Sequence, residues 1–130
     1  MILVLQTGTE DNLLELRDID GDIMFSKSWP ASKLLSEELP GLIEDALSSL
    51  KLMFEDVTGV IVFKGPGSYT GLRIGITVVN AIADQVGAPI VGQTGENWIE
   101  DGMARLKLSE NDQIVLPEYG GEANITKPWK

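Results

Sequence analysis

The chain contains neither cysteine nor histidine among its 130 residues. Without thiols it can form no disulfide and no thiolate metal site, which permits a reducing compartment. Without an imidazole, no hydroxyl can be activated by a histidine base, and Ser68 lacks the flanking glycines of the nucleophile pattern G-x-S-x-G. We therefore expect no catalytic residue, no metal ligand and no enzymatic activity.

Positive charge is also scarce. Ten Lys and Arg residues stand against 20 Asp and Glu, which gives a formal net charge of −10. Such a surface repels a phosphate backbone, so we expect no direct binding of nucleic acid. The first apolar run spans only residues 2–5 and follows no basic leader. We therefore expect neither a signal peptide nor a membrane span, and we expect a cytoplasmic location.

The apolar pattern predicts one α/β domain, because 43% of the residues are apolar and the chain has the length of a single domain. Short strand-like runs separated by turn residues come first, and helical periodicity follows. The expected strands are 2–7, 12–19, 22–28, 60–63, one beginning at 89–92, and a short one at 113–116. The expected helices are 32–50, 70–86 and 96–106, with Thr94 as a possible N-cap for the last.

Two of these helices have distinctive patterns. In the first, leucines and other apolar residues recur at spacings of three and four residues, and Pro40 predicts that the helix kinks or restarts there. The second carries two apolar stripes, which predicts burial on more than one side. One stripe is Leu72, Ile76, Val79, Ala83 and Val86; the other is Ile74, Val78 and Ile82. Trp98 is expected in the core, and Trp129 is expected to pack the tail onto the domain or onto a partner.

The most informative segment is GPGSYTGLRIG at residues 65–75, which joins a strand to the second helix. Its glycines and proline predict a tight turn, and either Ser68 or Thr70 can be the N-cap. The spacing does not match the P-loop, because only three residues separate Gly67 from Gly71 and no lysine follows. It does not match the dinucleotide fingerprint either, since Thr70 replaces the third glycine.

Gly71 and Gly75 lie on one face of the second helix, which predicts close approach of another helix rather than anion binding. From this we expect Gly71→Leu or Gly75→Leu to disrupt association more than folding. Arg73 is the one cation between Lys64 and Arg105. We expect it to pair with a carboxylate of the first helix (Glu37, Glu38 or Glu44) or to lie at an interface edge, the alternative being an exposed arginine.

The whole undecapeptide closely resembles the signature of the bacterial TsaB (YeaZ) family. The resemblance extends to residues 1–8, to SEELP at 36–40 and to PIVG at 89–92. It implies a ribonuclease H-like (actin-like ATPase) domain, with a mixed five-stranded sheet of order 3-2-1-4-5 and helices on both faces. It also implies a second domain that this sequence does not contain, so residues 1–106 would be the domain and 107–130 a tail packing on the domain or a partner.

The resemblance further implies a scaffold that binds and activates an ATP-using TsaD-like subunit together with a TsaE-like ATPase. That complex modifies tRNA, which this protein would meet only indirectly; alone it would be a homodimer, without cofactor or membrane contact. The signature loop is Gly65, Pro66, Gly67, Ser68, Tyr69 and Thr70. The expected partner interface is Leu35, Leu39, Leu42, Gly71, Leu72, Arg73, Gly75 and Val79.

Site residues of catalytic relatives are replaced here. Gln6 stands where they carry an aspartate after the first strand, and a neutral amide is a poor ligand for a hard cation. The carboxylates at 10–11, 18–20, 55–56 and 110–112 are expected to be solvated turn residues. Two alternatives remain: a small nucleotide- or phosphate-binding protein that uses the loop from Gly65 to Thr70, and a homodimeric structural domain.

Overall fold

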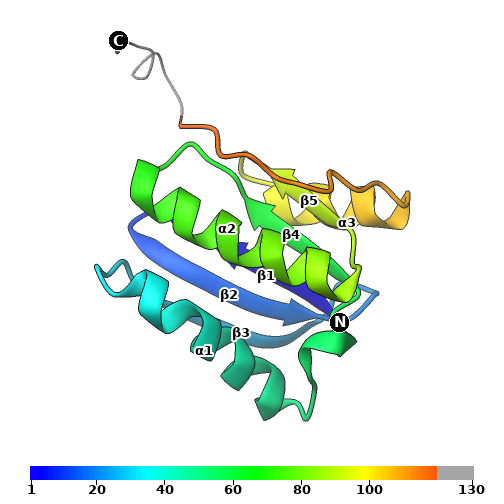
Figure 1. Cartoon of the computed structure of the whole chain (residues 1–130). Helices are drawn as coiled ribbons and strands as arrows, with labels where there is room; N and C mark the ends of the chain where they lie inside the picture. The colour runs from blue at the N-terminus through cyan, green and yellow to red at the C-terminus, as the bar shows by residue number, and fades with distance from the viewer. Residues whose placement is uncertain (120–130) are drawn as a thin grey trace.

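A computed structural model describes residues 1–119 and begins with an antiparallel meander (Figure 1). The strands are β1 (Ile2–Gln6), β2 (Asp11–Arg17) and β3 (Ile23–Pro30). β1 pairs with β2, and β2 pairs with β3 through a register shift between Leu16 and Arg17. The predicted strands are therefore confirmed, with ends that differ by one or two residues.

The second half of the sheet is parallel. β4 (Gly59–Phe63) pairs with β1, and β5 (Ile90–Gln93) pairs with β4. The full order is β3-β2-β1-β4-β5, which confirms the predicted order 3-2-1-4-5. β4 and β5 are joined by a crossover through α2 (Tyr69–Val86), as parallel neighbours require.

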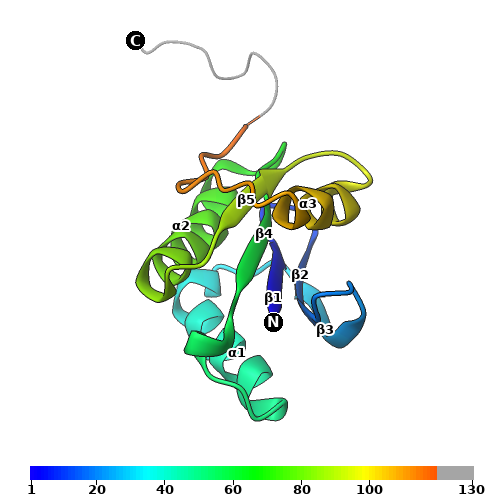
Figure 2. The ribbon, with the colours of Figure 1, turned by 90° about the vertical axis from the view of Figure 1, so that its right-hand side faces the viewer.

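Helices cover both faces of the sheet, as predicted (Figure 2). α1 (Leu35–Ser49) and α2 lie on one face, and α3 (Trp98–Lys107) lies on the other, against β4 and β5. The ring centroids of Phe63 and Trp98 are 5.6 Å apart, which confirms Trp98 as a core residue. Because helices cover both faces of β4, all five of its residues are buried.

Side-chain alternation divides the core between the two faces. In β1, Leu3 and Leu5 point to the same face of the sheet as Thr7, whose side chain meets α2. Their partners in the neighbouring strands share this face: Leu16 and Val60 for Leu3, and Leu14 and Val62 for Leu5. They are fully buried. Ile61, on the opposite face, meets Gly102 of α3. The sheet is therefore the middle layer of a three-layer domain.

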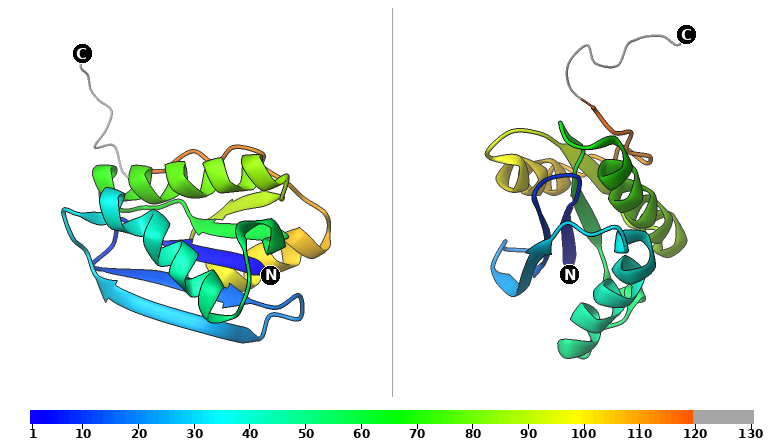
Figure 3. Two further views of the ribbon diagram at one scale, coloured as in Figure 1. Left: turned by 60° about the horizontal axis from the view of Figure 1, so that its bottom comes forward. Right: turned by 90° about the vertical axis from the view of Figure 1, so that its left-hand side faces the viewer.

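α1 runs without interruption through Pro40, so the predicted restart does not occur. The helix begins at Leu35 rather than at 32, because the Ser32 hydroxyl accepts a hydrogen bond from the Leu34 N–H in a preceding turn. Pro40 is exposed, so water can hydrate the carbonyl group that the proline leaves unpaired. A short 3₁₀ helix, η1 (Phe54–Asp56), links α1 to β4 (Figure 3, left).

Two predictions near the end of the described chain are wrong. α3 begins at Trp98, and Asn97 rather than Thr94 occupies the N-cap position, without a side-chain cap bond. Residues 113–116 form no strand. Side chains of Asn111 and Asp112, rather than a backbone ladder, contact the edge of β5 here. The tail residues 120–130, including Trp129, lie outside the described residues.

Within residues 1–119, no helix has the length and apolar character needed to cross a bilayer.

Candidate functional site

The signature loop is fastened to the turn that follows β1. Ser68 is the N-cap of α2, and its hydroxyl accepts a hydrogen bond from the Gly71 N–H at 3.2 Å. The Ser68 N–H donates to the Gly8 carbonyl at 2.8 Å. Of the two predicted N-caps, the structure therefore selects Ser68 over Thr70, and the loop is held at both its backbone and its side chain.

The glycines of α2 pack inside the domain. A Cβ atom on Gly71 would lie 2.7 Å from the Gly8 Cα, and one on Gly75 would lie 2.2 Å from the Thr7 Oγ1. The Thr7 hydroxyl donates to the Gly71 carbonyl at 2.7 Å. The helix therefore rests directly on the end of β1, and the prediction of a helix-helix contact through Gly71 and Gly75 is wrong. Sequence reasoning missed Thr7, because nothing in a one-dimensional pattern pairs it with residues 64 positions away or more.

A cleft of about 350 Å³ lies beside this junction. The turn after β1, the segment leading into α1 and the start of α2 form its walls. Its lining residues include Gly8, Thr9, Asn12, Lys33, Ser68 and Thr70. Lys33 and the first-turn N–H groups of α2 give this cleft local positive character. Among residues 1–119, no group of three or more acidic side chains is placed to hold a metal ion.

Two buried polar atoms near the cleft have no hydrogen-bond partner, the Asn12 Oδ1 and the Trp29 Nε1. Asn12 and Trp29 face each other across β2 and β3. One atom is an acceptor and the other a donor. Asn12 is also one of the residues that line the cleft.

The flank of α2 that faces α1 and η1 carries the second apolar stripe, which packs against the edge of the core. Ile74, Val78 and Ile82 are each half-buried, at spacings that place them on one line along the helix. A groove of about 270 Å³ beside Ile74 and Val78 reaches Ser36 of α1, and a hollow of about 400 Å³ beside Ile82 reaches Phe54 of η1. We call these three aliphatic side chains the outer stripe.

Most of the predicted interface residues belong to the core. Leu35, Leu39, Leu72 and Val79 are no more than 3% exposed, and Gly75 is buried. The reason is that the stripe with the strongest helical period is the one that packs on the sheet. Arg73 is exposed, and Leu42 and Gly71 are partly exposed. A surface role for these helices therefore depends on their outward residues, which the sequence pattern alone did not separate from the inward ones.

Arg73 pairs with no carboxylate among the described residues, so the predicted ion pair with α1 is wrong, and its position at an interface edge stays a prediction. Its Nη1 donates to the Tyr69 hydroxyl at 3.2 Å, and its guanidinium carbon lies 5.1 Å from the centre of the Tyr69 ring. The Tyr69 ring packs on Tyr119, with 4.6 Å between centroids. Burial raises the pKa of Tyr119, with a smaller contribution from Tyr69. The exposed guanidinium thus stacks on an aromatic ring instead of forming an ion pair.

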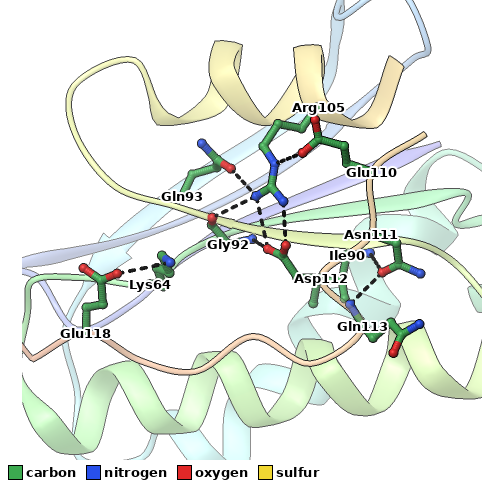
Figure 4. Close-up of polar contacts among 10 residues, drawn as sticks. All are labelled: Lys64, Ile90, Gly92, Gln93, Arg105, Glu110, Asn111, Asp112, Gln113 and Glu118. Carbon is green, nitrogen blue, oxygen red and sulfur yellow. Dashed lines mark hydrogen bonds and ion pairs between the residues drawn. The ribbon is translucent and has the colours of Figure 1, made fainter. Parts of the chain in front are cut away.

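A second polar cluster joins α3, β5 and the segment that follows α3 (Figure 4). The Arg105 guanidinium contacts Glu110 at 2.6 Å, the Gln93 side-chain oxygen at 2.8 Å, and both carboxylate oxygens of Asp112 at 2.5 and 3.1 Å. The hydrogen bond from Arg105 holds the pKa of Asp112 below its usual range, and the Asp112 and Glu110 partners raise the pKa of Arg105. Asp112 and Glu110 are therefore exposed, as predicted, but the prediction missed that both are ion-paired with Arg105.

The sheet order, the antiparallel meander feeding a parallel pair, and the helices on both faces define a ribonuclease H-like domain of the actin-like ATPase class. Within that class, the family model of TsaD, tRNA N6-adenosine threonylcarbamoyltransferase, matches residues 30–94. The chain belongs to this family and is a TsaB (YeaZ)-like member of it.

Individual relatives point to the same family. A tRNA N6-adenosine threonylcarbamoyltransferase of Geotalea uraniireducens is 37% identical over 98 residues, 73% of this chain and 28% of that protein. The tRNA threonylcarbamoyladenosine biosynthesis protein TsaB of Bacillus subtilis is 38% identical over 48 residues, 37% of this chain and 21% of that protein. The structure of YeaZ from Pseudomonas aeruginosa superposes with a TM-score of 0.65 and 27% identity over 72% of this chain.

The chain covers much less than the full length of these relatives. It spans 28% of the Geotalea transferase, 21% of the Bacillus TsaB and 43% of the Pseudomonas YeaZ chain.

Proposed function

We propose that this protein is a non-catalytic scaffold subunit in the formation of tRNA N6-threonylcarbamoyladenosine, and that it binds and activates a TsaD-like catalytic subunit. The observation that carries the proposal is the outer stripe of α2. A TsaE-like ATPase would complete the assembly, and alone the protein would form a homodimer through the same surface. With a net charge of −10, it would meet tRNA only through the complex.

The outer stripe has the features of a helix-docking surface. Three aliphatic side chains follow one line on α2, with a groove at one end and a hollow at the other. The described chain leaves them half-buried, packed against the core on one side and open to the two depressions on the other. A partner helix laid along α2 would insert its side chains into these depressions and remove the stripe from water.

A scaffold role requires no chemistry from this chain. Gln6 at the end of β1 offers no charge to a cation, and the sequence contains no histidine to serve as a base. Activation would instead come from binding energy. If the partner's active conformation presents the better surface to α1 and α2, association raises the population of that conformation. The acidic α1 surface, with Glu37, Glu38 and Glu44 exposed, favours a partner with basic residues at the rim of its interface.

The test is Val78→Asp. We expect this variant to weaken binding of the host's TsaD-like protein by about thirtyfold or more, which corresponds to about 2 kcal/mol, because a carboxylate would be desolvated at the centre of the interface. The protein should stay folded, because Val78 is only half-buried, and circular dichroism of the variant checks this. Isothermal titration or biolayer interferometry measures the Kd.

The matched control is Ala104→Asp, which places the same charge at an exposed position of α3 on the opposite face of the sheet. It should bind like the wild type. Equal affinity of Val78→Asp and the wild type would exclude the outer stripe as the docking surface.

The cleft beside the signature loop supports a second candidate, a small nucleotide- or phosphate-binding protein. Its support is the cleft volume of about 350 Å³, with Lys33 and the N-terminus of α2 on its walls. On the scaffold proposal, we expect isothermal titration with ATP or ADP and magnesium to show no micromolar binding. Micromolar affinity that Lys33→Ala abolishes would establish the second candidate instead.

A further inference from the structure

The two edges of the sheet are protected in different ways. A sheet edge exposes unpaired N–H and C=O groups, which invite another strand to add. The β3 edge carries Lys27 and Pro30, together with the irregularity at Leu16/Arg17 in its pairing with β2. Charge, proline and irregular pairing each discourage strand addition. β5 reads Ile-Val-Gly-Gln, with no charge and no proline inside the strand, so its edge needs another form of protection.

The segment that follows α3 supplies this protection. We call residues 108–119 the strap; Figure 1 shows it passing along β5 and above α2. The Ile90 N–H donates to the Asn111 side-chain oxygen at 3.0 Å, and the Gly92 N–H donates to the Asp112 carboxylate at 2.8 Å. The Asp112 N–H donates to the Ile90 carbonyl at 2.8 Å, and Arg105 donates to the Gly92 carbonyl at 3.4 Å.

All four main-chain groups of Ile90 and Gly92 are thus engaged by groups outside the sheet (Figure 4). Three of the four bonds come from side chains, so the strap covers the edge without becoming a strand. The strap does not run as a strand beside β5, so it does not present a new edge of free backbone groups. This distinguishes a terminating cover from a sixth strand, which would only move the open edge outward.

The strap is fastened at three further points. Val115 packs over Gly92, where an added Cβ would lie 2.5 Å from the Val115 Cγ1. The Asn80 side chain forms two hydrogen bonds with the Val115 backbone, both 3.0 Å long. The Glu118 N–H donates to the Lys64 carbonyl at 2.6 Å, and its carboxylate lies 3.1 Å from the Lys64 Nζ.

We propose that the strap is a built-in mask that keeps the β5 edge closed to strand addition by a second copy of this chain. Asn111 and Asp112 are its masking residues, and Arg105 positions Asp112. A second copy is the occupant that the unmasked edge fits. Two identical uncharged β5 strands can pair antiparallel about a two-fold axis, without bringing like charges opposite each other.

The experiment uses the double variant Asn111→Ala/Asp112→Ala of the full chain, in a Val78→Asp background that removes association through the outer stripe. Amide hydrogen exchange at Ile90 and Gly92 should accelerate by about tenfold or more, because both N–H groups lose their acceptors. Sedimentation velocity should show a weight-average mass that rises with concentration. The background keeps this result separate from any failure of the proposed partner surface.

The matched control is Glu110→Ala in the same background. It removes a carboxylate that pairs with Arg105 but contacts no group of β5, so exchange and mass should remain those of the parent. A second variant, Gly92→Ala, displaces Val115 by steric overlap and loosens the strap, so exchange at position 90 should accelerate and mass should rise although both acceptor side chains remain.

If the folded double variant shows unchanged amide exchange at Ile90 and Gly92, the proposed masking role of the strap is refuted. Faster exchange with a mass that stays that of the parent at every concentration would overturn strand addition by a second copy.

Discussion

Replacing Gly75 by alanine should lower the free energy of unfolding by about 2–3 kcal/mol, and the Tm by roughly 6–15 °C. Gly75 is buried against β1, and the new Cβ would lie 2.2 Å from the Thr7 Oγ1 and 3.0 Å from its Cγ2. Thr7 cannot turn away freely, because its hydroxyl holds the Gly71 carbonyl at 2.7 Å. The helix must therefore move off the sheet. Thermal and urea unfolding followed by circular dichroism measures the effect.

Two controls separate this steric effect from helix propensity. Gly41→Ala lies inside α1 with nothing within 4 Å of the added atom, so it should stabilise the protein by about 0.5–1 kcal/mol. Adding Thr7→Ala to Gly75→Ala makes room for the new methyl group, and the pair should show a favourable coupling of about 1 kcal/mol or more. A Gly75→Ala protein as stable as the wild type would refute the close approach of α2 to β1.

Truncating Leu72 to alanine should have an effect of similar or larger size, about 2–5 kcal/mol. Leu72 is fully buried, and three glycines lie against it: ideal Cβ atoms on Gly8, Gly67 and Gly65 would be 2.7, 3.2 and 3.3 Å from its side-chain carbons. The side chain thus supports both the turn after β1 and the signature loop. Its removal would leave a cavity that rigid backbone on three sides cannot fill.

Ile74→Ala is the control for Leu72→Ala, because it lies two residues away on the outer stripe and is only half-buried. Its unfolding free energy should fall by about 1 kcal/mol or less. Ile74→Ala should weaken partner binding more than Leu72→Ala does, since it removes part of the proposed docking surface. Equal stability losses for the two variants would contradict the division of α2 into an inner and an outer face.

That division matters for the proposed function. In the sequence, both apolar stripes of the second helix are candidates for a partner surface, and the residues first predicted for the interface came mostly from the inner one. The structure assigns Leu72 and Val79 to the core and leaves Val78 half-buried at its edge. Variants of the inner stripe therefore report on folding, and only variants of the outer stripe report on association.

Much of the fold follows from local chemistry that the sequence states directly. Alternating apolar residues, turn residues such as those at 20–21, and a 3.6-residue period specify strands and helices, because these periods arise from backbone geometry within a few residues. The undecapeptide at 65–75 was enough to indicate the family and its sheet order, and the Ser68 N-cap is a contact across only three residues.

What the sequence alone determined, then, is the five strands of the sheet, the three α-helices, their order, the acidic net charge and the absence of thiol and imidazole chemistry. The tertiary structure decided what each element faces. It placed Gly75 on Thr7 rather than on a partner helix, stacked Arg73 on Tyr69, and joined Asp112 to Arg105 and the β5 edge. The physical reason is that a periodic pattern marks which residues avoid water but not which surface covers them, and that choice depends on contacts between distant segments.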